Sequence, residues 1–314
     1  MWPLYNFVDG ATTINVAIDI WTICELSSGA DTQIIIESTD LNKTWKFQDW
    51  KSFKTAQDEK LLFYQSILNI FEKELSKRGF NLKTTSQSPI GGGLGGSSSL
   101  VISVLKAMYQ FTGIKQPAAN ELVCLAHNIE AKMLRTPTGT QDYFPAVTGG
   151  LSFIDYGFDH MEQKVSKVSE TPIQDHFLLV YTGRSHHSGL NNFEVLKSSV
   201  QGDQKVLSAL KKIKNIAFKM KTAIAEQNWK ELPNLFLQEY EARLELTPAF
   251  SSPEIEKLNE LCKSAGAEAV KICGAGGGGC VLVWVAPEYR QKVIEKCRAE
   301  NFTCLDARPV DVLN

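Results

Sequence analysis

Two short glycine-rich segments constrain this chain more than any other feature. Of its 22 glycines, five fall between residues 91 and 96 and five between residues 274 and 279. Glycine adopts the positive φ angles of tight turns and lets a backbone approach a ligand closely. The total glycine content is ordinary, so the information lies in the clustering and not in the composition.

Length and charge exclude several classes of protein. The 314 residues correspond to about two domains at roughly 150 residues per domain. The 33 Lys and Arg nearly balance the 35 Asp and Glu, which excludes a global basic field for nucleic acid. No apolar run approaches the roughly 18 residues that span a bilayer. We expect a cytoplasmic protein that binds neither nucleic acid nor membrane, and a homodimer stays open.

The seven cysteines are odd in number and scattered, with no C-x-x-C pair. This distribution indicates reduced thiols and not a disulfide framework. No Cys and His grouping has the spacing of a zinc site.

Hydrophobic periodicity predicts a mixture of strands and helices. Strands are expected where apolar and β-branched residues alternate or form short runs: 14–26, 32–38, 80–87, 150–156, 177–181, 269–273 and 280–285. Helices are expected where apolar residues recur three and four apart: 58–78, 97–110, 117–134, 254–264, 288–299 and a long stretch, 191–246, interrupted near 202 and 227–229. No repeat or linker marks a boundary, so a division near residue 155 rests on little local signal.

The first glycine cluster lies between a predicted strand and a predicted helix, in the segment Ser88-Pro89-Ile90-Gly91-Gly92-Gly93-Leu94-Gly95-Gly96-Ser97-Ser98-Ser99. The start of a helix offers N–H groups without intrahelical partners and the positive end of the helix dipole, which suit a polyphosphate. Three serines add hydroxyl oxygens, the ligand type that Mg²⁺ prefers. The alternative is a flexible turn with serine capping.

Two other phosphate-binding motifs fit less well. A P-loop requires Gly-Lys-Ser/Thr, and the chain has no Gly-Lys pair. The dinucleotide pattern G-x-G-x-x-G matches both clusters, at Gly91, Gly93 and Gly96 and at Gly274, Gly276 and Gly279. That pattern also needs an acidic residue about 20 positions later. Residues 111–116 contain no acid, and Glu295 lies inside a predicted helix, so the dinucleotide interpretation is disfavoured.

The first cluster resembles the ATP-binding motif of the GHMP kinases, the family of galactokinase, homoserine kinase, mevalonate kinase and phosphomevalonate kinase. That motif reads Pro-x-x-x-Gly-Leu-Gly-Ser-Ser-Ala, and the chain has Pro89-x-x-x-Gly93-Leu94-Gly95-Gly96-Ser97-Ser98. Gly96 replaces the first serine, a departure associated with the branch of heptose kinases and fucokinase. The second cluster, within 271–280, resembles the family's C-terminal glycine motif, which packs against the nucleotide and substrate loops. Two motifs in family order are more specific than either alone.

This resemblance covers the chain from about Gly10 to the C-terminus and implies an α+β fold of two lobes. The N-terminal lobe, 1–155, would bind ATP and resemble domain 2 of ribosomal protein S5, and the C-terminal lobe, 156–314, would be ferredoxin-like. The implied cofactors are ATP and Mg²⁺. The implied phosphate-binding residues are Pro89, Gly91, Gly92, Gly93, Leu94, Gly95, Gly96, Ser97 and Ser98.

The middle of the chain carries the residues that the resemblance assigns to chemistry. Residues 138–143 are similar to the Gly-x-Gln-Asp-Gln segment of sugar kinases in this family, and by that match Asp142 is the catalytic aspartate. Phosphoryl transfer needs a carboxylate that orients the acceptor hydroxyl and takes its proton. Glu130 matches the helix glutamate that coordinates Mg²⁺, with Ser97 as its partner ligand. The structural alternatives are a turn residue at 142 and a solvated helix face at 130.

A further loop, which follows a predicted strand, is expected near the substrate. Relatives place a Thr-Gly loop near the sugar, and here Arg184 follows Thr182-Gly183. Its guanidinium could clamp a phosphate or carboxylate on the substrate, and the alternative is a plain surface loop. The adjacent His186 and His187 have no nearby third ligand, so a metal site there is disfavoured. The expected substrate-binding residues are Gly139, Gln141, Asp142, Arg184, Gly276 and Gly277.

The sequence therefore predicts an ATP-dependent kinase that transfers the γ-phosphoryl group to a hydroxyl of a sugar or sugar phosphate. The competing interpretation is a catalytically impaired regulator that binds a nucleotide or sugar on the same fold. It is motivated by the start of the chain at Met1, where the family has a further strand and a basic motif, so we expect a truncation or alternative start. Heptose 7-phosphate, fucose and galactose all remain candidate acceptors, because pocket residues vary within one fold.

Overall fold

The computed structural model describes residues 10–136, 138–157, 160–185, 188–274 and 276–313. The chain forms two compact units, and each is discontinuous in sequence. Unit 1 comprises Met1–Asp19, Pro89–Gly95 and Thr148–Asn314, and unit 2 comprises Ile20–Ser88 and Gly96–Val147. The chain passes between the two units more than once, so no single residue separates them. The predicted boundary near residue 155 stays a prediction.

Unit 2 is built on a four-stranded sheet in the order β2-β5-β3-β4. Its strands are β2 (Thr22–Ser28), β3 (Ile34–Ser38), β4 (Lys43–Phe47) and β5 (Phe80–Ser86). The β3 and β5 pair is parallel, and the other two pairs are antiparallel. Its helices are α1 (Trp50–Thr55), α2 (Leu62–Leu68), the 3₁₀ turn η2 (Asn69–Phe71), α3 (Glu72–Leu75), α4 (Gly96–Thr112), α5 (Ala119–Leu134) and α6 (Tyr143–Thr148).

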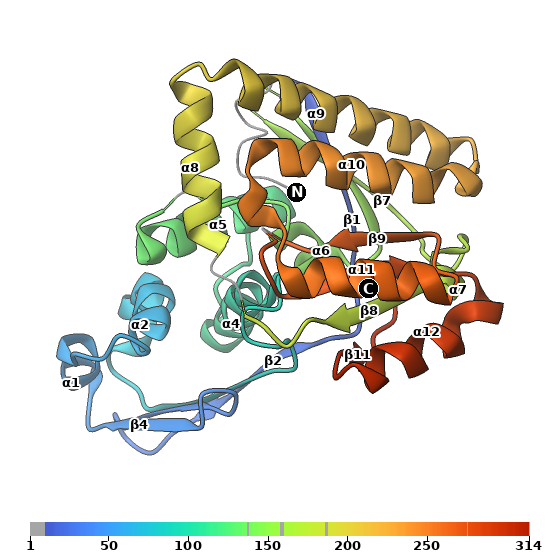
Figure 1. Cartoon of the computed structure of the whole chain (residues 1–314). Helices are drawn as coiled ribbons and strands as arrows, with labels where there is room; N and C mark the ends of the chain where they lie inside the picture. The colour runs from blue at the N-terminus through green and yellow to red at the C-terminus, as the bar shows by residue number, and fades with distance from the viewer. Residues whose placement is uncertain (1–9, 137, 158–159, 186–187, 275, 314) are drawn as a thin grey trace. The chain divides into compact units, whose positions relative to one another are not determined.

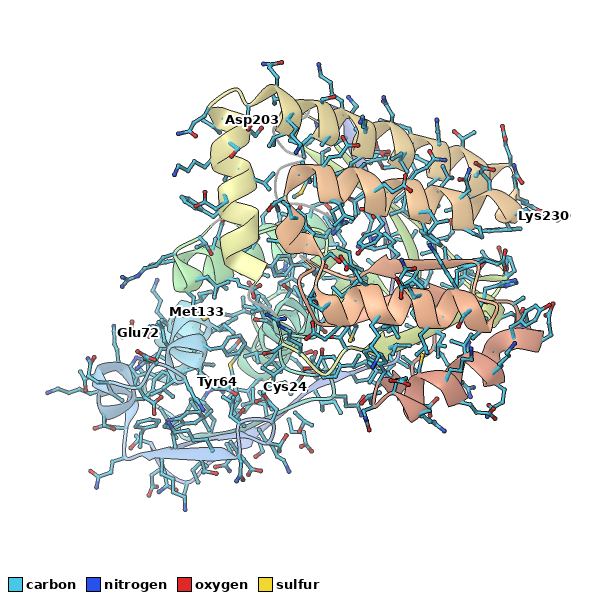
Figure 2. The ribbon with its side chains drawn as sticks, in the orientation of Figure 1. Cys24, Tyr64, Glu72, Met133, Asp203 and Lys230 are labelled. Carbon is cyan, nitrogen blue, oxygen red and sulfur yellow. The ribbon has the colours of Figure 1, made fainter. Side chains whose placement is uncertain are left out.

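The core of unit 2 lies where its helices meet the sheet. The apolar face expected on the helix after the first glycine cluster is buried on α4, at Leu100, Val101, Val104, Leu105 and Met108. Tyr64 on α2 (Figure 2) is 1% exposed. Its hydroxyl shares a 2.6 Å hydrogen bond with Thr84 on β5. The predicted helix over 58–78 is present, interrupted by the short 3₁₀ turn η2.

Unit 1 contains a four-stranded antiparallel sheet in the order β11-β8-β10-β9. The strands are β8 (Phe177–Tyr181), β9 (Ala269–Ile272), β10 (Cys280–Trp284) and β11 (Thr303–Leu305). In chain order this sheet runs fourth, first, third, second. Helices connect the first strand to the second and the third to the fourth, which is the ferredoxin-like arrangement that the sequence predicted.

Helices of unit 1 follow the predicted pattern closely. They are α7 (Ile173–His176), α8 (Ser188–Val200), α9 (Gln204–Ala225), the 3₁₀ turns η3 (Trp229–Glu231) and η4 (Pro248–Phe250), α10 (Leu232–Leu246), α11 (Pro253–Ala265) and α12 (Pro287–Ala299). The helical stretch over 191–246 breaks at the two expected places. After the first break, Asp203 accepts hydrogen bonds from the amides of Lys205 and Val206 and caps α9 (Figure 2). After the second, α10 runs beside α9 (Figure 1).

A second sheet of unit 1 corrects one sequence prediction. Its strands β1 (Ala11–Val16), β6 (Leu151–Tyr156) and β7 (Met161–Ser166) are antiparallel, in the order β1-β6-β7. The single strand predicted over 14–26 is wrong, because β1 ends at Val16 and β2 begins at Thr22. Between them, Ile18 bridges Pro309, so a long-range pairing that no local pattern reveals divides the segment.

No helix among the described residues combines the length and apolar character needed to cross a membrane. Several short elements lack a sequence signal, namely β4, β7, β11, α1, α6 and α7. The strand β7 shows why, since it alternates half-buried and exposed residues and contains Glu162, Gln163 and Lys164.

Candidate active site

The first glycine cluster forms the loop Pro89–Gly95 that runs directly into α4. Gly91, Gly93 and Gly95 have φ of 68°, 71° and 71°, in the left-handed region where only glycine is unstrained. A Cβ on Gly92 would lie 2.8 Å from the carbonyl oxygen of Pro89. The path of this loop therefore requires the glycines that the sequence supplies.

Gly96, the departure from the family motif, has a local structural reason. It begins α4, and a Cβ there would lie 2.8 Å from Cβ of Ser88 and 2.9 Å from Oγ of Ser88. A serine side chain at position 96 would therefore force Ser88 to move. Ser97, in the first turn of α4, is exposed.

The second glycine cluster packs directly against the first loop. The amide of Cys280 donates to the carbonyl oxygen of Gly92 at 2.7 Å. A Cβ on Gly274 would lie 2.9 Å from Cα of Gly93 and 3.0 Å from its carbonyl oxygen. Backbone meets backbone here, so the packing that the sequence predicted between two distant segments is present within unit 1.

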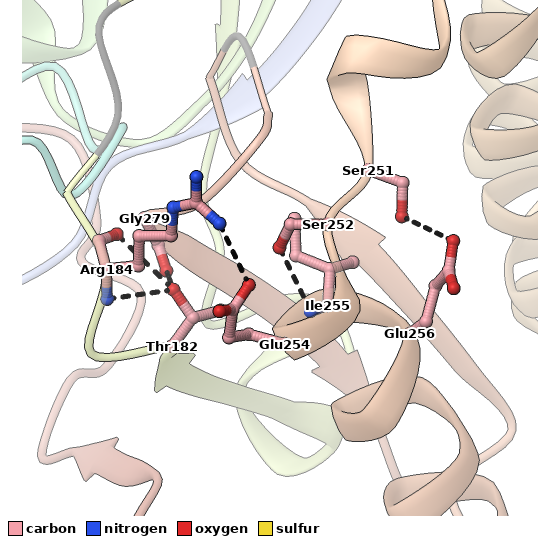
Figure 3. A network of polar contacts seen from close by, with 8 residues as sticks. All are labelled: Thr182, Arg184, Ser251, Ser252, Glu254, Ile255, Glu256 and Gly279. Carbon is pink, nitrogen blue, oxygen red and sulfur yellow. Dashed lines mark hydrogen bonds and ion pairs between the residues drawn. The ribbon is translucent and has the colours of Figure 1, made fainter.

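The Thr-Gly-Arg loop after β8 is tied to the second cluster (Figure 3). The hydroxyl of Thr182 donates to the carbonyl oxygen of Gly279 at 2.8 Å, and the amide of Gly279 donates to the carbonyl oxygen of Arg184 at 2.7 Å. The Arg184 guanidinium is exposed and lies 3.3 Å from Glu254. An exposed pair of this kind contributes little stability, so exchanging Glu254 for a substrate anion costs little.

A buried charge cluster that the sequence did not predict lies against the second glycine cluster. Arg243 and Glu239 on α10 form an ion pair and are 1% and 2% exposed. Lys271 at the end of β9 lies 3.3 Å from the other oxygen of Glu239. Burial opposes ionisation of Glu239, but Arg243 and Lys271 together hold the pKa of that carboxyl below its usual value. The only sequence signal was the spacing of Glu239 and Arg243, four residues apart on a predicted helix.

Unit 2 carries the expected magnesium ligand in a hydrogen-bonded cluster. Glu130 on α5 is 5% exposed. Its Oε2 accepts a hydrogen bond from the Ser98 hydroxyl at 2.9 Å and another from the Tyr143 hydroxyl at 2.5 Å. The structure thus brings Ser98 to Glu130, whereas the sequence paired Glu130 with Ser97. Burial, with the adjacent Glu130 carboxylate, raises the pKa of Tyr143, so its hydroxyl stays protonated and donates.

Asp142 lies immediately before α6, beside this cluster in the chain. Burial raises the pKa of its carboxyl, and the negative charge of Glu130 raises it further. A raised pKa makes the carboxylate a stronger base than an ordinary aspartate. Asp142 is half-buried, and its assignment as the catalytic base stays a prediction.

The segment before Asp142 is anchored to α5. Nε2 of His127 lies 3.0 Å from the carbonyl oxygen of Thr138. The Gln141 side chain folds over Gly139, where a Cβ would lie 2.0 Å from Oε1 of Gln141. Three of the expected substrate residues, Gly139, Gln141 and Asp142, are therefore held in one short segment.

The donor set in each unit fits the group that the sequence predicted there. Both hydroxyl donors to Glu130 end on Oε2, so neither uses Oε1, and Mg²⁺ takes such carboxylate and hydroxyl oxygens. Among the described residues no group of three His, Cys, Asp or Glu could hold a metal. Mg²⁺ typically takes one or two protein ligands and completes its shell with phosphate and water. In unit 1, the glycines of the two loops have no side chains, so a ligand could approach the backbone there closely.

Family comparisons agree with this architecture. The model of the GHMP kinases N terminal domain matches residues 62–150, and that of the GHMP kinases C terminal domain matches residues 220–303. Together the two models span more than half of the chain. The chain belongs to the GHMP kinase family.

The chain is similar to several kinases of this family along most of its length. The chain is 29% identical to a D-glycero-alpha-D-manno-heptose 7-phosphate kinase from Campylobacter jejuni, over 92% of this chain and 85% of the relative. It is 26% identical to a mevalonate kinase from Thermococcus sibiricus, over 92% and 87% of the two chains. Its fold matches the crystal structure of Lactococcus lactis galactokinase complexed with galactose with a TM-score of 0.79 at 16% identity, covering 99% of this chain and 91% of that one.

Proposed function

We propose that this protein is an ATP-dependent kinase that transfers the γ-phosphoryl group to a hydroxyl of a sugar or sugar phosphate. The observation that carries the proposal is the backbone contact between the two glycine loops, in a chain that belongs to the GHMP kinases. The similarity to a heptose 7-phosphate kinase supports a sugar phosphate as acceptor.

The phosphates of ATP would bind along the first glycine loop and the start of α4. Main-chain N–H groups and the positive end of a helix dipole stabilise such anions. The residues proposed for this role are Pro89, Gly91, Gly92, Gly93, Leu94, Gly95, Gly96, Ser97 and Ser98.

Ser97 and Glu130 would hold Mg²⁺. When bound, the ion supplies positive charge that neutralises the phosphate oxygens. Tyr143 and Ser98 act on Glu130 rather than on the ion, because both hydroxyls fix the orientation of its carboxylate through Oε2. Groups that orient a ligand side chain in this way commonly decide how well the metal binds.

Asp142 would orient the acceptor hydroxyl and take its proton. Its raised pKa supports this role, because burial and the charge of Glu130 make the carboxylate a stronger base. Gly139, Gln141, Gly276 and Gly277 are proposed to contact the acceptor. Arg184, exposed and only weakly paired, is proposed to bind an anionic group on it.

Release of ADP at fixed Mg-ATP tests the proposal. The panel contains D-glycero-D-manno-heptose 7-phosphate, galactose, fucose and mevalonate, with a reaction lacking acceptor as control. We expect turnover on at least one sugar or sugar phosphate. Binding of ATP without turnover on any acceptor would favour the regulator instead. Turnover on mevalonate alone would place the chain with the mevalonate kinases. A cytoplasmic location and a homodimer stay predictions.

A further inference from the structure

The segment formed by α10 and the following turn η4 is hydrogen-bonded to the second glycine cluster at two points. Nη1 of Arg243 donates to the carbonyl oxygen of Gly274 at 2.7 Å. The amide of Gly277 donates to the carbonyl oxygen of Phe250 at 2.9 Å. Between these points a Cβ on Gly276 would lie 2.4 Å from that same Phe250 oxygen. One continuous segment therefore contacts the first part of the cluster at Gly274, Gly276 and Gly277.

Arg243 is itself held in one orientation. Its Nε donates to Oε1 of Glu239 at 3.0 Å, and its Nη2 donates to the same oxygen. Its guanidinium carbon lies 5.9 Å from the centre of the Phe250 ring. The ammonium group of Lys271 forms an ion pair with the second oxygen of Glu239. Because the guanidinium is planar and its donors form a rigid fork, the contact with Glu239 determines where Nη1 points.

Stability alone does not account for this arrangement. Removing two charges from water costs roughly as much as their attraction returns, and apolar side chains of similar volume often stabilise a protein equally well. What an apolar side chain cannot provide is a donor to the Gly274 carbonyl. The buried pair therefore serves to position the donor that contacts the Gly274 carbonyl.

The position of Gly274 determines the position of the first glycine loop. Gly274 lies against Gly93, where its own Cβ would come within 2.9 Å of the Gly93 Cα. A few residues later, Cys280 donates to Gly92. A displacement of the second cluster would therefore displace the backbone that is proposed to bind phosphate.

We propose that Arg243 is a positioning residue of the nucleotide site, which acts through the Gly274 carbonyl to hold the two glycine loops in register. The expected effect on ATP binding rests on the proposed function. The tethering of the two loops does not, because it is a property of the protein without ligand.

Hydrogen exchange of the full-length, ligand-free protein tests the tether. In Arg243→Met we expect the amides of 91–96 and 276–280 to exchange at least about tenfold faster than in the wild type, the effect of one lost hydrogen bond of roughly 1.4 kcal/mol. Amides of β8 should be unchanged. The matched control is Lys221→Met, which removes a 2.6 Å ion pair with Asp155 elsewhere in unit 1. Equal exchange of both glycine segments in Arg243→Met and the wild type would overturn the proposal.

Steady-state kinetics separate positioning from a general loss of structure. We expect Arg243→Met to raise the KM for ATP about tenfold or more while kcat changes less, and Arg243→Lys to give an intermediate KM because lysine keeps the charge but not the fork. Should Arg243→Met not fold, Arg243→Lys still decides, since unchanged loop exchange in it contradicts the tether. If the wild type itself transfers no phosphoryl group, the proposed function fails, and the exchange measurement still tests the tether.

Discussion

The two regions that carry the proposed chemistry are built in opposite ways. In unit 1, the glycine loops meet through backbone atoms, as in the hydrogen bond from Cys280 to Gly92. In unit 2, Ser98, Glu130 and Tyr143 meet through side chains, with two hydroxyls on one carboxylate oxygen. The first region depends on the absence of side chains, and the second depends on particular side chains.

This difference decides which substitutions each region tolerates. A backbone site is destroyed by adding atoms, because a new Cβ collides with a neighbouring carbonyl or Cα. A side-chain site is weakened by removing atoms, because a buried carboxylate loses a donor.

Asp142→Asn should lower turnover by about 10²–10⁴-fold, the usual contribution of a general base, because asparagine cannot take the proton of the substrate hydroxyl. Nucleotide affinity should be nearly unchanged. Phosphoryl-transfer rates and calorimetric titration with Mg-ATP measure the two quantities. Glu25→Gln is the control, since it removes an exposed carboxylate from the same unit. Turnover equal to the wild type would end the assignment of Asp142 as the base.

Gly274→Ala should weaken ATP binding roughly 100-fold. The positive φ of 58° and the 2.9 Å approach to Gly93 together cost about 3 kcal/mol, which only a shift of the loops can relieve. Gly202→Ala is the matched control, because Gly202 has φ of 81° with nothing within 4 Å of its would-be Cβ. Both variants bear backbone strain, so equal ATP affinities would show that loop contact does not matter.

Tyr143→Phe should raise the Mg²⁺ concentration needed for half-maximal activity about tenfold, because Glu130 keeps only the Ser98 donor. A magnesium titration at saturating ATP and acceptor measures this. Tyr64→Phe removes an equally buried hydroxyl of unit 2 that bonds Thr84 instead. We expect it to lower stability alone, and an equal magnesium shift in both variants would rule out a specific role for Tyr143.

The smallest effect concerns pH and stability. Burial and Glu130 raise the pKa of Asp142 in the folded protein above the value of about 3.9 in an unfolded chain. The folded protein therefore holds this proton more tightly, and stability falls as pH rises through that interval. Asp142→Asn should unfold at a higher temperature than the wild type at neutral pH, and the gain should shrink as the pH falls through the raised pKa of the folded protein and be lost below about pH 4. A loss of thermal stability at neutral pH would contradict the raised pKa.

Sequence alone predicted the backbone region well. Glycines at positive φ are visible as glycines, and two motifs in family order predicted that Gly274–Gly279 packs against the first loop. The family resemblance also implied the ferredoxin-like sheet, although its short edge strand β11 carries no sequence signal of its own. The error at 14–26 arose because Ile18 pairs with Pro309, at the far end of the chain.

The side-chain regions were less predictable for a physical reason. Whether Ser97 or Ser98 bonds Glu130 depends on the rotation of α4, which glycine-rich sequence before it does not fix. Tyr143 carries no local signal, since an aromatic residue at a helix start is ordinary in any core. The contact of Arg243 with Gly274 joins a helix to a loop 31 residues later, a pairing that only the fold establishes.

³¹P NMR with each sugar and sugar phosphate in turn follows the γ-phosphate of ATP and so tests phosphoryl transfer directly. We expect a new phosphate monoester signal on at least one acceptor, growing as ADP forms and absent in Asp142→Asn. If ATP binds but no monoester forms with any acceptor, or if only inorganic phosphate appears, the chain is not the sugar kinase proposed here.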